Sequence, residues 1–184
     1  ICAPMVGGSE LAFRLLTRRY GCSLAYTPMI SSSRFPLEKE YRDQEFQTTP
    51  DDRPLVAHFS ANDPQQLLQS ALMVQDKCDA IDLNLGCPQR IAHAGHFGSY
   101  LLDPEDRPLV LSIVKTVSES VSIPVFVKIR LLNTVPETIE LVNQLAEAGA
   151  SLVCIHGRYR VNLVGRTGAG ARDGAAHLDQ IAEV

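Results

Sequence analysis

The stretch "AIDLNLGCP", Ala80–Pro88, carries the pattern that decides the fold. Its apolar run, Ala80–Leu85, is short and stops before a glycine and a proline, which is typical of a strand buried on both faces of a parallel sheet. Five other runs share this form: Ile1–Val6, Cys22–Thr27, Pro54–Phe59, Ile123–Ile129 and Ser151–His156. Stretches with helical spacing separate the runs, so the chain predicts a repeated βα unit.

Five helices are expected between or after these strands, most of them with a polar residue at the N-cap. They run from Ser9 to Gly21, from Asn62 or Asp63 onward, from Asp106 to Ser120, from Thr134 to Gly149, and over Ala175–Val184. Pro64 suits the first position of the second helix. Thr134 and Glu137 have the spacing of a capping box.

Six βα units in 184 residues fit either a barrel cut short or an open doubly wound sheet. A complete (β/α)₈ barrel typically needs about 250 residues. The chain stops in a predicted helix with no closing strand after it, so we expect an α/β fold, a TIM (β/α)8-type barrel truncated after about six βα units. Ser31–Arg53 is expected to be a polar loop, and the Gly165–Gly170 run a flexible insertion.

Composition limits the class of protein. The net charge is −4, which gives no overall attraction to nucleic acid or to anionic membranes. No apolar run reaches the roughly 18 residues that a membrane span requires, so no membrane contact is expected. The five cysteines contain no CxxC pair, which predicts a reducing compartment and a cytoplasmic location.

Polar side chains recur where the predicted strands end, although the strands themselves are apolar. They are Pro4 with Met5, His58, Asn84 with Cys87, Lys128 with Arg130, and His156 with Arg158. The carboxyl ends of barrel strands form the catalytic face, so this set predicts an active site.

Cys87 has three possible roles on this face. It could be a nucleophile with His93 or His96 as its base, or a metal ligand together with those two histidines. It could instead be a general acid, because a thiol with a pKa of about 8.5 is mostly protonated at neutral pH. An inert cysteine in a turn is the fourth interpretation, and spacing alone does not choose among them.

Six motifs together resemble the tRNA-dihydrouridine synthases, most closely their eukaryotic branches. The motifs are "APMV" (Ala3–Val6), "YTPMI" (Tyr26–Ile30), "DLNLGCPQR" (Asp82–Arg90), "GHFGSYLL" (Gly95–Leu102), "VKIR" (Val127–Arg130) and "IHGR" (Ile155–Arg158). The resemblance extends from Ala3 to Arg158, and the segment around Cys87 is its most specific part.

The resemblance implies FMN-dependent reduction of uridine to 5,6-dihydrouridine in tRNA, with NADPH as reductant. Hydride would pass from reduced FMN to C6 of the uracil, and Cys87 would give a proton to C5. The implied cofactor contacts are Ala3, Pro4, Met5, His58, Lys128 and His156, and the implied substrate contacts are Asn84, Arg130 and His93. A monomer without a metal is expected.

Two positions depart from the family pattern, and part of the family's length is missing. His58 stands where the family usually has a glutamine that meets the flavin ring, and His93 stands in place of a common lysine. Residues 1–184 would be a partial FMN-binding barrel domain without strands seven and eight or the C-terminal helical RNA-binding domain. We therefore expect weak flavin retention and low tRNA affinity for this segment alone. Two alternatives remain: another flavin barrel that reduces a small molecule, and a catalytically silent RNA-binding remnant.

Overall fold

The computed structural model describes residues 1–160 and 174–184, so the Gly165–Gly170 run lies outside the described residues. The strands are β1 (Ala25–Tyr26), β2 (Ile30–Ser31), β3 (Leu55–Ser60), β4 (Ala80–Leu85), β5 (Val125–Leu131) and β6 (Leu152–Tyr159). The α-helices are α1 (Leu11–Arg19), α2 (Lys39–Glu45), α3 (Pro64–Val74), α4 (Arg90–Ala94), α5 (Arg107–Ser118), α6 (Val135–Glu147) and α7 (Leu178–Glu183). Two 3₁₀ turns, η1 (Gly98–Leu101) and η2 (Pro104–Asp106), precede α5.

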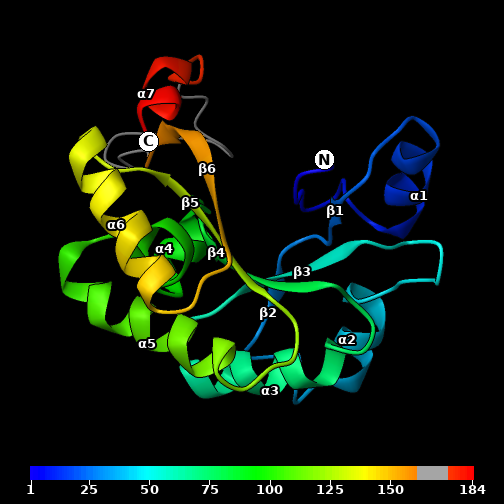
Figure 1. Cartoon of the computed structure of the whole chain (residues 1–184). Helices are drawn as coiled ribbons and strands as arrows, with labels where there is room; N and C mark the ends of the chain where they lie inside the picture. Colours follow the sequence, from blue (N-terminus) through cyan, green and yellow to red (C-terminus); the bar gives the residue numbers. More distant parts are fainter. Residues whose placement is uncertain (161–173) are drawn as a thin grey trace.

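The sheet is parallel throughout and follows chain order, β1-β3-β4-β5-β6, with β2 paired to the far end of β3. A doubly wound sheet reverses its strand order at a switch point, and no reversal occurs among the described strands. Figure 1 shows the sheet as a curled arc with α3, α5 and α6 along one side. The expected α/β fold of a truncated TIM-type barrel is confirmed.

The pleat of the strands separates an apolar outer face from an inner face that changes from apolar to polar along the strands. Leu55, Ala57 and Phe59 of β3 pack in the main core, which the helices cover. The alternate residue Val56 joins a smaller apolar cluster with Tyr26 and Ala80. Further along the same inner face the side chains become polar, and this change of character places the candidate site at the carboxyl ends of the strands.

The predicted capping signals are confirmed at two helices and wrong at a third. Asp63 caps α3 by accepting hydrogen bonds from Gln65 N (2.8 Å) and Gln66 N (2.9 Å). Thr134 forms the predicted capping box at α6. Ser9 does not cap α1, because its hydroxyl instead accepts from Met5 N and donates to Met5 O.

The expected strand Ile1–Val6 is wrong, because the structure has only one parallel bridge there, Cys2 to Ala25. Pro4 has no N–H to continue a ladder. β6 was expected to be buried on both faces like the other strands, but it is only partly covered along its length.

The expected polar loop Ser31–Arg53 contains a helix that the apolar pattern could not indicate. Helix α2 has no buried residue and therefore no apolar stripe of helical spacing. Lys39 and Asp43 form an ion pair one turn apart on it, which supports an exposed helix. The hydroxyl of Tyr41 accepts a hydrogen bond from Ser31 N (2.8 Å) and so ties α2 to β2.

A buried ion pair joins α1 to the segment before β3. Arg14 is 1% exposed, and its Nε and Nη2 donate to Asp52 Oδ2 at 2.9 and 2.7 Å. Arg18 reaches the other carboxylate oxygen at 3.2 Å. Both arginines are thus ion-pair partners of Asp52. Among the helices of the described residues, none combines the length and the apolar content that crossing a bilayer requires.

Candidate active site

The carboxyl ends of the strands enclose a cavity of about 250 Å³ that brings most of the predicted site residues together. The lining residues are Pro4, Met5, Val6, Met29, His58, Asn84, Gly86, Cys87, Gln89, Lys128, Arg130 and His156. Three predicted residues, Ala3, His93 and Arg158, do not line it. The convergence follows from the fold, because parallel strands present their carboxyl ends at one edge of the sheet.

The loop that carries Cys87 is held from two directions. Asn84 Oδ1 accepts hydrogen bonds from Gly86 N (2.7 Å) and Cys87 N (2.9 Å). The carbonyl of Cys87 accepts from the backbone N and the hydroxyl of Ser99, at 3.0 and 2.9 Å. Gly98, at φ +66°, brings the chain close enough for these contacts. The thiol therefore stands on a fixed turn rather than on a loose loop.

Burial raises the pKa of the Cys87 thiol above its ordinary value. A backbone hydrogen bond from Gln89 and the nearby charge of Arg130 lower that pKa, but less than burial raises it. The thiol therefore keeps its proton at neutral pH. A nucleophilic cysteine needs the opposite shift, toward thiolate, so this environment favours a proton donor.

The two histidines that could have assisted Cys87 are engaged elsewhere. His93 packs edge-to-face on Tyr100, with ring centroids 4.9 Å apart, and His96 Nε2 lies 2.9 Å from Asp106 Oδ1. Within residues 1–160 and 174–184, no group of three or more His, Cys, Asp or Glu side chains is arranged to hold a metal ion. The arrangement of Cys87, His93 and His96 as metal ligands is therefore not formed.

A buried polar layer lies on the inner face of β3 and β4, below Cys87. His58 Nδ1 is hydrogen-bonded to Asp82 Oδ2, and His58 Nε2 lies 3.0 Å from Asn84 Nδ2. The second carboxylate oxygen, Asp82 Oδ1, is buried and has no hydrogen-bond partner among the described residues. Asp82 is not among the predicted site residues, although a lone carboxylate inside an apolar strand is a usable signal.

Lys128 carries a positive charge into the same interior from β5. Burial lowers the pKa of the Lys128 ammonium, while Cys154 and Asp82 raise it by a smaller amount. Lys128 is paired in register with Cys154 on β6, and the same lysine lowers the pKa of Cys154, which burial raises. Within the described part of the chain the ammonium makes no hydrogen bond. It therefore remains available to a ligand with an acceptor atom.

Arg130 joins the Cys87 loop to β6. Its Nε donates to Gly86 O at 2.7 Å and its Nη1 donates to Tyr159 O at 2.9 Å. His156 is its register partner on β6 and lines the same cavity. Gln89 and Met29 also line the cavity but are not among the predicted site residues. They occur only within the "DLNLGCPQR" and "YTPMI" motifs, because neither residue type signals chemistry by itself.

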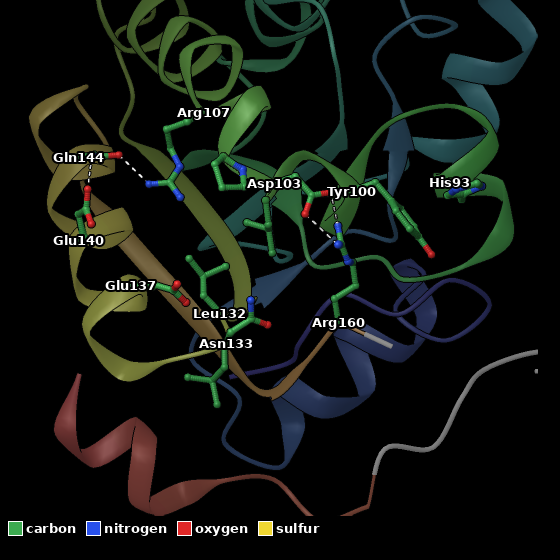
Figure 2. A pocket seen from close by; sticks show the side chains of 13 residues that line it. His93, Tyr100, Asp103, Arg107, Leu132, Asn133, Glu137, Glu140, Gln144 and Arg160 are labelled. Carbon is green, nitrogen blue, oxygen red and sulfur yellow. Dashed lines mark hydrogen bonds and ion pairs between the residues drawn. The ribbon is translucent and has the colours of Figure 1, made fainter. Parts of the chain in front are cut away.

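His93 lies instead in a second cavity of about 830 Å³, between α6 and the segment that leads into α5 (Figure 2). Arg160 donates to both carboxylate oxygens of Asp103, at 2.7 and 2.8 Å, and lies 5.3 Å from the Tyr100 ring centroid. Arg107 donates to Gln144 at 2.8 Å. The second cavity thus has charges of both signs, of which Arg160 and Asp103 form an ion pair.

The fold and the cavity define a class: an α/β barrel-type protein with a cysteine, a lysine and an arginine at the carboxyl ends of its strands. The family model for dihydrouridine synthase (Dus) matches residues 1–184, and the chain belongs to this family. The family resemblance seen in the sequence motifs is confirmed.

Several curated relatives are similar to this chain. The tRNA-dihydrouridine(16/17) synthase NAD(P)(+) of Saccharomyces cerevisiae is 44% identical over 91% of this chain and 40% of its own length. The similarly named protein of Mus musculus, with the suffix "-like", is 45% identical over 87% of this chain and 34% of its own length. The tRNA-dihydrouridine(20a/20b) synthase NAD(P)+-like of Homo sapiens is 41% identical over 86% of this chain and 50% of its own length. The chain thus spans between about a third and a half of these relatives.

One solved structure supports the fold alone. A truncated form of 3-deoxy-D-arabino-heptulosonate 7-phosphate synthase from Thermotoga maritima matches with a TM-score of 0.50 and 13% identity. The match covers 100% of this chain and 58% of that chain.

Proposed function

We propose that this chain is the first part of an FMN-binding barrel domain that reduces uridine to 5,6-dihydrouridine in tRNA. The observation that carries the proposal is one cavity at the strand ends that is lined by Lys128, Arg130 and a Cys87 thiol that keeps its proton. Family membership and the names of the relatives agree with it. Those names include NAD(P), which supports a nicotinamide, NADPH by our expectation, as the source of electrons.

The residues of the cavity fit FMN. Lys128 offers an ammonium without a hydrogen bond among the described residues, which suits the acceptor atoms of a flavin or its phosphate. Pro4 and Met5 give the cavity an apolar wall that suits a flat aromatic ring. When bound, FMN supplies the hydride. Lys128 would hold the cofactor, with His156 beside it.

Cys87 would act as the general acid of the reaction. Its Sγ would hold the proton until the uracil lies in the cavity, and would then give it to C5. Arg130, whose side chain is 8% exposed and tied to Gly86, would lie against the base. A uridine in tRNA has to leave its stack to reach a cavity of this kind, as base-modifying enzymes require.

The test is Cys87→Ala in the full-length protein, assayed for dihydrouridine in tRNA and for flavin absorbance. We expect turnover to fall by about 10²–10⁴-fold, the usual contribution of a general acid, with flavin binding retained. Cys22→Ala is the matched control, because the Cys22 thiol lies 3.1 Å from Leu24 O, outside the cavity. Unchanged turnover in Cys87→Ala would show that another group gives the proton.

A further inference from the structure

The side chain of Asn84 connects the Cys87 loop to the buried histidine–carboxylate pair. Its Oδ1 accepts from Gly86 N and Cys87 N, and its Nδ2 lies 3.0 Å from both His58 Nε2 and Met29 Sδ. An asparagine amide has two acceptor positions and two donor hydrogens. All four are used inside the protein, although the Met29 sulfur is only a weak acceptor.

The donor and acceptor of each hydrogen bond between Cys87 and Asp82 follow from the two backbone amides of Gly86 and Cys87. A backbone N–H can only donate, so the oxygen of Asn84 must face Gly86 and Cys87. The NH₂ group therefore faces His58 Nε2, which has to be the unprotonated, accepting nitrogen. The proton of the neutral imidazole is then on Nδ1, where it is donated to Asp82 Oδ2.

This chain of hydrogen bonds is shielded from water. Asp82 is fully buried, His58 is 2% exposed and Asn84 is 7% exposed. His58 N also donates to Thr27 Oγ1 at 3.0 Å, and the ring of Tyr26 packs edge-on against His58. Hydrogen bonds in a buried network are stronger than in water and hold a single arrangement.

We propose that Asp82, His58 and Asn84 are positioning residues that fix the turn on which the Cys87 thiol stands. Asn84 thus acts on the loop that carries Cys87, and it also lines the cavity in which the family resemblance implies a substrate contact. The kinetic consequence rests on the proposed function, whereas the placement of the thiol does not.

Two replacements of His58 separate positioning from packing. Glutamine has both a donor and an acceptor, so His58→Gln can still link Asp82 to Asn84. His58→Leu fills similar space without either. The primary measurement is the rate at which iodoacetamide alkylates Cys87 in the full-length protein, followed by peptide mass spectrometry. His177→Leu is the control, because His177 lies at the start of α7 and does not line the cavity.

We expect Cys87 in His58→Leu to be alkylated several-fold faster than in the wild type, and His58→Gln to restore the wild-type rate. In the same variant kcat should fall by about 10²-fold with little change in KM, because a small misplacement of a reacting group costs that much. An unchanged alkylation rate in folded His58→Leu would overturn the proposal.

Asp82→Asn is the second variant, and it decides the matter if His58→Leu does not fold. Asparagine has nearly the same shape as aspartate, but its amide does not require the His58 proton to be on Nδ1. The same substitution of the orienting aspartate in a serine-protease triad allows the wrong histidine tautomer. Faster alkylation of Cys87 supports positioning, and the wild-type rate refutes it. If Cys87→Ala keeps turnover while these variants still speed alkylation, the general-acid role of Cys87 fails and the positioning role stands. If the full-length wild-type protein forms no dihydrouridine while the variants still speed alkylation, the proposed function fails and the positioning role stands.

Discussion

Replacing Gly98 with alanine tests whether the Cys87 turn depends on a close approach of two backbone segments. A Cβ at Gly98 would lie 2.8 Å from the carbonyl oxygen of Cys87 and 2.9 Å from its Cβ. Neither atom can move away by a side-chain rotation. The 3.0 Å hydrogen bond from Ser99 N to Cys87 O would therefore have to lengthen or break, and the thiol would move with the turn.

Three contributions set the size of the effect on stability. At φ +66° an alanine has the left-handed conformation, which costs an L-residue about 1–2 kcal/mol. Overpacking against fixed atoms adds about 1–3 kcal/mol, and the smaller entropy of the unfolded alanine chain offsets about 0.4–1 kcal/mol. Gly98→Ala should thus lower the free energy of unfolding by about 1–5 kcal/mol.

Gly21→Ala provides the matched control. Gly21 has φ +89°, but a Cβ there meets no atom within 4 Å. It should show only the conformational cost, so Gly98→Ala should lose about 1–3 kcal/mol more in urea unfolding. Only Gly98→Ala should also reduce dihydrouridine formation, by about 10²-fold. Equal losses of stability in the two variants, or wild-type turnover in Gly98→Ala, would refute this account of the turn.

Three further predictions concern stability. Thr134→Ala should lose about 1 kcal/mol of the free energy of unfolding, while Thr134→Ser should lose little, because only alanine removes the capping oxygen. Asp52→Ala should lose about 3–5 kcal/mol, because it leaves the buried Arg14 without its carboxylate; Glu38→Ala, which breaks an exposed pair, should be indistinguishable from the wild type. Burial raises the pKa of Cys78 to about 12, whereas the thiol of the unfolded chain has a pKa of about 8.5. Above about pH 8.5 the unfolded chain therefore binds fewer protons than the folded one. Stability should then fall by up to about 1.4 kcal/mol per pH unit between pH 8.5 and 10 in urea unfolding, and Cys78→Ala should have a shallower slope; equal slopes would contradict it.

The strands with long apolar runs were predictable because burial on both faces leaves a signal in the local sequence. β4 occupies Ala80–Leu85, the predicted run itself. The elements that were missed or misplaced lack such a signal. α2 has no fully buried residue, β2 is two residues long, and the apolar run Ile1–Val6 is broken by Pro4, so composition and periodicity could not describe them.

The candidate site was predictable to the extent that it depends on strand ends. Pro4, Met5, Cys87, Lys128 and Arg130 were expected there, and the structure places them around one cavity. Interactions between side chains on different strands could not be predicted. His58 and Asp82 are 24 residues apart in the chain, and their contact depends on the register of β3 against β4. The sequence offers no local mark of that register.

The inner face of the sheet shows that this polar layer is not explained by stability. Lower on the same face, Val56 and Ala80 pack in an apolar cluster, so the interior can be filled without charges. Above them, Asp82 keeps one buried oxygen without a hydrogen bond, and burial acts against the charge of Lys128. Buried charges that lack full compensation destabilise a fold, and departures of this kind concentrate at functional sites. The position of the layer, directly below the Cys87 turn, therefore supports a role in chemistry rather than in folding.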